Sequence, residues 1–185
     1  GEHYVKQSWR NRCDILTANG TAALTVNVER GNAKIKMKDM RIDYSKRWRH
    51  THWQSIVSAY KGSPYFDHYR DRLEPFYLRH YAFLYDLDAD LTSTLLEMLG
   101  STVTPRYSEQ YLDPRELPSD GSAVDLRNCM SPKPRLSRPD PEFAPVEYWQ
   151  VFSDRTPFVP NLSVIYLLFC EGPCTLDIID RSILR

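Results

Sequence analysis

Prolines are the feature that most limits the folds open to this chain, because ten of the 13 stand between residues 105 and 160. Each proline removes a backbone hydrogen-bond donor, so such a stretch cannot build the interior of a sheet. It predicts a long ordered loop over a core, or a segment without fixed structure. A lid or recognition arm is the functional alternative, since long loops in compact domains often carry binding residues. The run "SPKPRLSRPDP" is also typical of a basic polyproline ligand.

Regular structure is predicted on both sides of this stretch. Residues 1–44 are rich in Val, Ile, Thr and Tyr, with a hairpin signal "ANGT" and a second turn at Gly31–Asn32, and indicate three or four antiparallel strands. Residues 45–100 show apolar residues at helical spacing between proline and glycine breaks, which predicts three helices. Residues 161–185 predict two more, the first capped by Asn161.

These elements together predict an α+β fold. We expect an amino-terminal antiparallel sheet of three to four strands packed against four to five helices, with residues 101–160 as a long proline-rich loop. The length of 185 residues suits one core, so residues 1–185 are expected to form a single domain.

Composition excludes several classes of protein. Lys plus Arg and Asp plus Glu both total 24, so the net charge is zero and no overall field draws the chain to nucleic acid. The longest apolar run, residues 162–170, is shorter than the roughly 20 residues that span a bilayer. The four cysteines form no CxxC pair, which indicates free thiols in a reducing cytoplasm. We therefore expect a cytoplasmic protein with no membrane span, no nucleic-acid partner and no metal site; the sequence assigns no cofactor.

The most suggestive group of charges lies near the amino terminus. If "YVKQSWRNRC" is a strand, its alternation places Lys6, Arg10 and Arg12 on one face. Two guanidinium groups and an amine suit a phosphate or a carboxylate, because guanidinium binds such anions through paired hydrogen bonds. The alternative is a solvated face whose cations pair with acidic neighbours such as Glu29 or Asp43. The residues leave both interpretations open.

The stretch "RWRHTHWQSI" holds two histidines that a strand would place side by side. Residues 45–62 are instead predicted to form a helix capped by Ser45, so His50 and His52 point about 200° apart and cannot share a metal ion. His50 is the better candidate for an anion contact or acid–base group, with a plain surface histidine as the alternative, and His52 is expected to be structural. Glu171 stands at a helix break, where a carboxylate either faces a pocket or caps the next helix.

Four blocks of sequence resemble the WbqC-like protein family, in the same order as in its members: "HYVKQSWRNRC", "DYSKRWRHTHWQSIVSAYKGSPYF", "DLRNCMSPK", and "YWQVF" followed by "FVPNLSVIYLLFCEGP". Members occur among bacterial O-antigen and other surface-polysaccharide genes, so the resemblance implies a transferase for a polysaccharide precursor, with glycine transfer to a sugar as one form. Tyr166 and Cys170 stand where the family pattern has Asp and Asn, which argues against a catalytic base on that helix.

The motif positions carried over from the family are mostly cationic or amide side chains. They are His50 and Glu171 as catalytic candidates, and Lys6, Arg10, Asn11, Arg12, Arg127, Lys133 and Asn161 as substrate-binding candidates.

This set of side chains suits a phosphorylated or carboxylated small molecule, such as a nucleotide sugar or an amino-acid donor. His50 or Glu171 would act as general base on an amine or hydroxyl. A second hypothesis is a non-catalytic binding or scaffold protein that docks to polysaccharide-synthesis proteins through the proline-rich loop.

Overall fold

A β-hairpin forms the sheet of this fold. In the computed structural model, β1 (Arg12–Thr17) pairs antiparallel with β2 (Gly20–Thr25), as the signal "ANGT" predicted. The backbone of Gly20 has a φ of +100°, a conformation that favours glycine, so the chain can reverse tightly here. The structure describes residues 2–29, 35–108, 110–127, 129–138 and 140–184, and within them the sheet has two strands rather than the expected three to four.

The missing strands have a physical explanation. The run from residue 4 to residue 10 is not a strand, because residues 6–10 form turns, with Gln7 at a φ of +57°. Residues 35–43 form the short 3-10 helix η1 (Met37–Asp39) and isolated bridges. Met40 and Ile42 are buried while Arg41 between them is exposed, so a single extended segment on the core gives the same alternation as a strand. The second expected turn, at Gly31–Asn32, lies outside the described residues.

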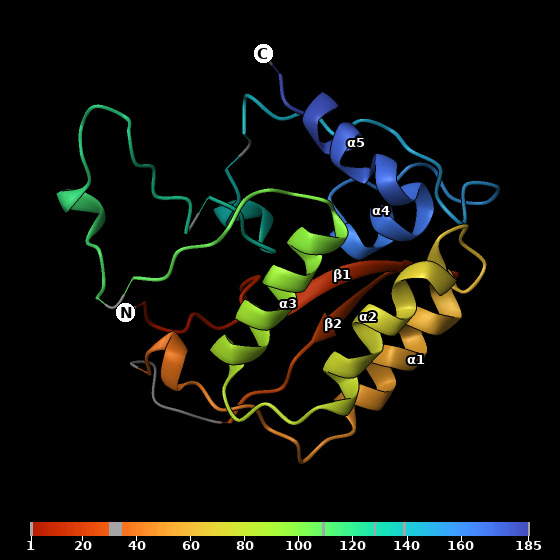
Figure 1. The fold of residues 1–185 in the computed structure, drawn as a ribbon, viewed down its shortest axis with the longest axis horizontal. Coiled ribbons are helices and arrows are strands. Elements are labelled where there is room, and N and C mark those ends of the chain that lie inside the picture. The colour runs from red at the N-terminus through yellow and green to blue at the C-terminus, as the bar shows by residue number, and fades with distance from the viewer. Residues whose placement is uncertain (1, 30–34, 109, 128, 139, 185) are drawn as a thin grey trace.

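Helices make up most of the regular structure in the described ranges, and Figure 1 shows them grouped around the hairpin. They are α1 (Trp48–Tyr60), α2 (Phe66–Leu78), α3 (Leu84–Met98), α4 (Val164–Glu171) and α5 (Thr175–Arg181). The fold is therefore mixed α and β, as expected. The upper end of the expected helix count is reached only by including α5, which has seven residues. None of the helices in the part described is long and apolar enough to cross a membrane.

The centre of the main core is a group of aromatic rings contributed by helices that are far apart in the sequence. Tyr60 and Tyr166 are fully buried and their rings stack with centroids 4.5 Å apart. Phe169 contacts both Tyr60 and Phe66, at 5.5 and 5.1 Å between centroids. The Leu16 backbone NH donates to the Tyr60 hydroxyl at 3.0 Å, which ties β1 to α1. The hairpin, α1, α2 and α4 are thus held by one buried aromatic cluster.

The proline-rich stretch has no α-helix or strand among its described residues, as its composition predicted. Two 3-10 turns interrupt it, η2 (Pro114–Glu116) and η3 (Pro134–Leu136). In Figure 1 its first half forms a wide green loop to one side of the helices. Its second half returns to the hairpin and helices, which we call the body of the molecule. There the Ala144 NH donates to the Ser182 carbonyl at 2.8 Å.

Candidate functional site

The predicted cationic face does not form, because residues 4–10 are not a strand. Lys6 is exposed on a turn, whereas Arg10 is half-buried and forms an ion pair with Glu2. Arg12 begins β1 and forms an ion pair with Asp14 at 3.2 Å. Arg10 and Arg12 therefore pair with different carboxylates, and the three cations do not line one strand face.

Acidic partners for these cations were one of the two alternatives, but the partners are not those expected. Glu29 lies 3.7 Å from Arg41, on the surface. The side chain of Asp43 accepts a hydrogen bond from the Ser45 backbone NH at 2.7 Å. Neither carboxylate pairs with Arg10 or Arg12, which pair instead with Glu2 and Asp14.

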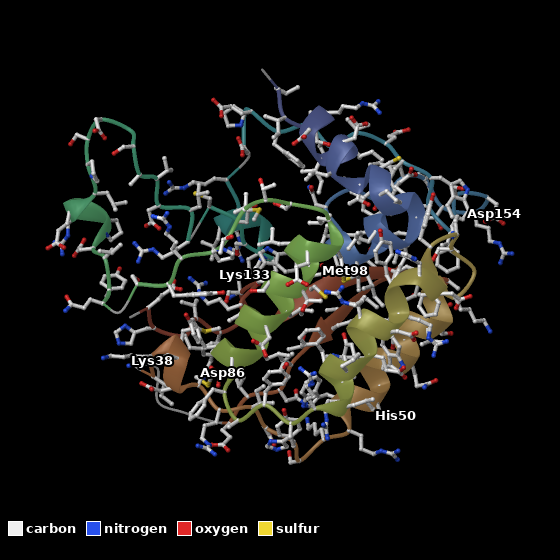
Figure 2. All side chains as sticks on the ribbon, viewed as in Figure 1. Lys38, His50, Asp86, Met98, Lys133 and Asp154 are labelled. Atoms are coloured by element: carbon white, nitrogen blue, oxygen red, sulfur yellow. The ribbon has the colours of Figure 1, made fainter. Side chains whose placement is uncertain are left out.

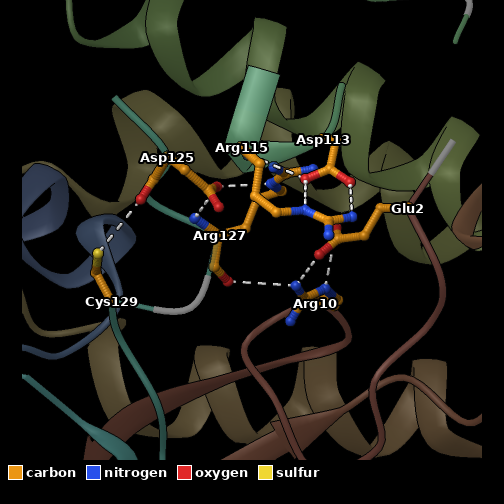
Figure 3. Close-up of polar contacts among 7 residues, drawn as sticks. All are labelled: Glu2, Arg10, Asp113, Arg115, Asp125, Arg127 and Cys129. Carbon is orange, nitrogen blue, oxygen red and sulfur yellow. Dashed lines mark hydrogen bonds and ion pairs between the residues drawn. The ribbon is translucent and has the colours of Figure 1, made fainter. Parts of the chain in front are cut away.

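Arg10 and Arg127 are predicted binding residues that the structure does bring together. Nη2 of Arg10 donates to the backbone carbonyl of Arg127 at 3.3 Å and also to the Glu2 carboxylate (Figure 3). These contacts fasten the proline-rich loop to the amino-terminal turns. The site thus lies at a junction between segments more than one hundred residues apart along the chain.

The guanidinium of Arg127 is held in a fixed orientation. Its Nε donates to Asp125 Oδ1 at 2.6 Å, and its central carbon, Cζ, lies 4.9 Å from the centroid of the Tyr111 ring. The hydrogen bond from Arg127 lowers the pKa of the Asp125 carboxyl, and Asp125 in turn raises the pKa of Arg127, so both groups stay charged. Among the described residues, the hydrogen bonds of this side chain use Nε alone. As far as the described ranges go, its two terminal amino groups thus remain available to an anion.

An open cavity of about 510 Å³ adjoins Arg127. Among the described residues, its charged wall consists of Glu2, Asp125 and Arg127. The rest of its wall is mainly polar and apolar side chains of the proline-rich loop: Ser108, Gln110, Tyr111, Leu112, Leu117, Val124 and Leu126. This volume is in the range of small-molecule sites. Charges of both signs beside apolar walls suit a small ligand that itself carries charge.

Asn11 has a structural position. It is 8% exposed, and its Nδ2 donates to the Val26 carbonyl at 2.8 Å while Val26 NH donates back to the Asn11 carbonyl at 2.8 Å. These two bonds extend the hairpin beyond Arg12 and Thr25. The amide is thereby used within the fold, because a buried amide needs its partners.

Lys133 and Asn161 are both exposed, and neither lines the cavity. Asn161 has a φ of +59°, and α4 begins three residues later, at Val164. The prediction that Asn161 caps this helix is therefore wrong. A residue in the left-handed region turns the chain before the helix instead of starting it.

The two catalytic candidates lie at opposite ends of α1. His50 is exposed in the first turn of α1 (Figure 2). Glu171 is half-buried at the end of α4. The neighbouring Phe169 carbonyl accepts a hydrogen bond from the NH of Tyr65, which follows the carboxyl end of α1, so Glu171 lies near that end. Ten helical residues separate His50 from Tyr60, which corresponds to about 15 Å. One substrate atom therefore cannot contact both side chains, and neither of them lines the cavity.

The helix break after Glu171 is closely packed. Gly172 has a φ of +54°, and a Cβ atom there would lie 2.6 Å from the ring of Tyr65. Glycine is required by both the backbone conformation and this contact. The break therefore has a packing function.

Burial dominates the chemistry of the titratable side chains inside the body. Burial lowers the pKa of His52 to about 4, partly offset by a hydrogen bond to the Thr25 backbone, in agreement with the expected structural role. Burial raises the pKa of Asp88 on α3 to about 7. Tyr166, where the family pattern has Asp, has its pKa raised by burial and accepts a bond from Val151 NH at 2.7 Å, so it is no base. In the ranges that the structure describes, no three His, Cys, Asp or Glu side chains gather as metal ligands would.

Sequence reasoning missed Glu2, Tyr111 and Asp125. One signal was present for Asp125, because an aspartate two residues before an arginine often forms a local turn that orients the arginine. That spacing occurs in "DPR" and in "DLR", and both form such turns. Glu2 and Tyr111 meet Arg10 and Arg127 only through the tertiary fold.

The chain belongs to the WbqC-like protein family, whose sequence profile matches residues 2–130. Every residue that lines the cavity falls within this range, whereas Lys133, Asn161 and Glu171 fall outside it. A curated relative, the uncharacterized protein Rv1507c of Mycobacterium tuberculosis, is 31% identical over 127 residues. The match covers 68% of this chain and 52% of the relative, so the chain spans about half the length of that protein. No solved structure matches the chain significantly.

Proposed function

We propose that this protein is a transferase in bacterial surface-polysaccharide biosynthesis, and that it binds a carboxylated or phosphorylated small molecule beside Arg127. One observation carries the proposal: a guanidinium fixed by Asp125 and Tyr111 at the wall of a cavity of about 510 Å³. A preoriented guanidinium binds carboxylate or phosphate with paired hydrogen bonds and loses little entropy in doing so. Family membership supports the biosynthetic context.

The charges of the cavity suit an amino-acid donor in particular. The carboxylate of glycine would bind the terminal amino groups of Arg127, and its ammonium group would lie near Glu2 or Asp125, which share the wall. The phosphates of a nucleotide sugar would use the same donors of Arg127. Among the described residues, each carboxylate of the cavity wall is already paired with an arginine, Glu2 with Arg10 and Asp125 with Arg127, so both would act on a ligand through their negative charge. His50 and Glu171 have no part in this proposal, since neither lines the cavity.

Ligand binding to single-site variants tests the proposal. Titration calorimetry with glycine and with a panel of nucleotide sugars should detect a ligand whose affinity falls roughly tenfold to a hundredfold in Arg127→Ala, the cost of a lost charged hydrogen bond. Arg127→Lys should recover part of the affinity, because lysine keeps the positive charge but cannot donate the paired hydrogen bonds of a guanidinium group.

Arg115→Ala is the matched control. Arg115 pairs with Asp113 in the same loop, its side chain is 88% exposed, and it does not line the cavity. Its loss should leave binding unchanged. Equal affinities of the wild type and Arg127→Ala, or equal losses in the two alanine variants, would overturn the proposal.

A second function is favoured by a different observation. The proline-rich loop exposes large apolar side chains, each more than half accessible: Val103, Leu112, Val124, Leu126, Met130 and Leu136. An exposed apolar side chain within a polyproline run suits docking to a partner protein, as for Leu136, 62% exposed within residues 131–141. This supports a scaffold that docks to polysaccharide-synthesis proteins. Deletion of residues 132–141 should then abolish recovery of those proteins in a pull-down without changing the melting temperature. Undiminished recovery by the deletion variant would count against the scaffold.

A further inference from the structure

One end of the molecule is formed by two segments that lie side by side, far from the cavity along the chain. Nη1 of Arg49 donates to the carbonyls of Leu78 and Arg79, at 3.1 and 2.9 Å. The rings of Tyr44 and His80 stack with centroids 4.2 Å apart. In Figure 1 the orange chain entering α1 and the yellow-green chain leaving α2 both follow the lower edge of the molecule. We call this surface the basic end and define it by Lys46, Arg47, Arg49, His50, Leu78, Arg79 and His80.

Positive charge is concentrated on the basic end. Lys46, Arg47 and Arg79 are exposed, Arg49 is half-buried, and the histidines His50 and His80 are exposed. The chain as a whole has zero net charge, so this concentration is local. It attracts anions over about 8 to 10 Å at physiological ionic strength.

Two acidic side chains lie near the basic end and are engaged locally. Asp43 accepts from the Ser45 backbone NH at 2.7 Å, and Asp90 accepts from the Tyr81 hydroxyl at 3.1 Å. The seven residues that define the basic end include four Lys and Arg residues and no Asp or Glu. In addition, α1 begins here with no acidic residue in its first turn, so the positive end of its dipole is not offset.

An exposed leucine stands among these cations. Leu78 is 72% exposed at the end of α2, directly before Arg79, and its carbonyl is bonded to Arg49. A single exposed leucine is ordinary on a protein surface. Surrounded by cations, however, it matches the way peripheral proteins hold an anionic bilayer: the cations bind headgroup phosphates and the apolar side chain enters the acyl boundary.

We propose that the basic end docks this protein on a bilayer surface that contains anionic lipids. Nucleic acid fits less well, because the Tyr44 ring is covered by Arg49 at 4.8 Å and by His80 at 4.2 Å, so it is not free to stack on a base. The contact is peripheral, and the cavity beside Arg127 takes no part in it. The inference is therefore independent of the proposed transferase.

Vesicle co-sedimentation tests this surface directly. The full chain should bind phosphatidylcholine vesicles that contain phosphatidylglycerol, should not bind vesicles of phosphatidylcholine alone, and should dissociate as salt is raised. The double variant Arg47→Ala/Arg79→Ala should partition roughly thirtyfold more weakly, from about 1 kcal/mol per cation. Leu78→Ser should weaken binding roughly threefold to tenfold through loss of apolar burial.

The control is a double variant with the same change of charge elsewhere. Lys61→Ala/Arg155→Ala removes two exposed cations, one of them just past the opposite end of α1. It should bind vesicles as the wild type does, with circular dichroism confirming that all variants are folded. Equal losses in both double variants, an unchanged Leu78→Ser, or a higher affinity for a short RNA duplex than for the anionic vesicles would each overturn the proposal.

Discussion

The body of the molecule and its proline-rich loop are stabilised by interactions of opposite range. In the body, Tyr60 packs on Tyr166 and Phe66 on Phe169, so elements distant in sequence bury one another. In the loop, side chains accept hydrogen bonds from backbone NH groups only two residues ahead; these acceptors are Asp113, Asp120, Asp125, Ser131 and Asp140. A segment too rich in proline to form the hydrogen bonds between paired strands can thus still be ordered by local turns.

The same contrast governs the titratable groups. In the body, burial shifts His52 and Asp88 toward their neutral forms, with pKa values of about 4 and about 7. In the loop, hydrogen bonds from serine or arginine two residues ahead lower the pKa values of Asp113, Asp120 and Asp125 and favour their charged forms. Desolvation thus dominates at His52 and Asp88, and local hydrogen bonding dominates at these three aspartates of the loop.

The largest effect is expected where the aromatic core is broken. Tyr60→Ala should lower the free energy of unfolding by about 3 to 5 kcal/mol, because it removes a fully buried ring and leaves the Leu16 NH without its acceptor. Tyr107→Ala, at a loop tyrosine that is 54% exposed, should change it by less than about 0.5 kcal/mol. Urea denaturation measures both. Similar losses in the two variants would remove the contrast between body and loop.

An intermediate effect is expected from pH. The folded pKa of His52, about 4, is below its unfolded value of 6.5, so the unfolded chain binds more protons between these values and stability rises with pH there. The folded pKa of Asp88, about 7, is above 3.8, so its contribution falls as pH rises from 3.8 to about 7. The two slopes oppose each other in the wild type over much of the same range.

Removing either group should expose the slope of the other. The Asp88→Asn variant should gain up to roughly 3 kcal/mol in free energy of unfolding as pH rises from about 4 to 6.5, the range in which His52 titrates. The His52→Gln variant should lose a similar amount as pH rises from 3.8 to about 7, the range in which Asp88 titrates. Thermal unfolding at a series of pH values measures this. Slopes of the same sign in the two variants would contradict the assignment.

The smallest effect is expected in the turns of the loop. Asp120 accepts from Ser122 NH at 2.9 Å, and Asp120→Ala should leave the global melting temperature unchanged while speeding proteolytic cleavage near residue 120. Because the folded pKa is lowered, the turn is retained above 3.8 and lost as pH falls through the folded pKa. Limited proteolysis with Asp154→Ala as control checks the effect. A large change in the melting temperature would show that the turn is coupled to the body.

Local pattern was sufficient for the elements that depend on local interactions. The hairpin at residues 12–25 and the helices α1 to α3 followed from turn chemistry and apolar spacing. The predicted strand at residues 4–10 was wrong because Gln7 turns the chain at a positive φ, for which glutamine gives no signal. Asn161 failed as a cap for a similar reason.

The candidate site was predictable only in part. Arg127 was chosen from the family resemblance, and Arg10 from both the predicted strand face and the resemblance. The contact between them depends on tertiary structure that no spacing in the sequence encodes. The ion pair of Arg10 with Glu2, and the stacking of Arg127 on Tyr111, arise in the same way. Local turns such as Asp125 with Arg127 were readable from the sequence, and long-range junctions were not.

The stacking of Tyr60 on Tyr166 also has a consequence for synthesis of the chain. Tyr166 leaves the ribosome 106 residues after Tyr60. At about 5 to 20 residues per second, the finished helices α1 and α2 wait roughly 5 to 20 seconds for the helix that covers their aromatic face. During that interval the nascent chain presents Tyr60 and Phe66 uncovered, and it is then that chaperone binding or aggregation would decide how much protein a cell obtains.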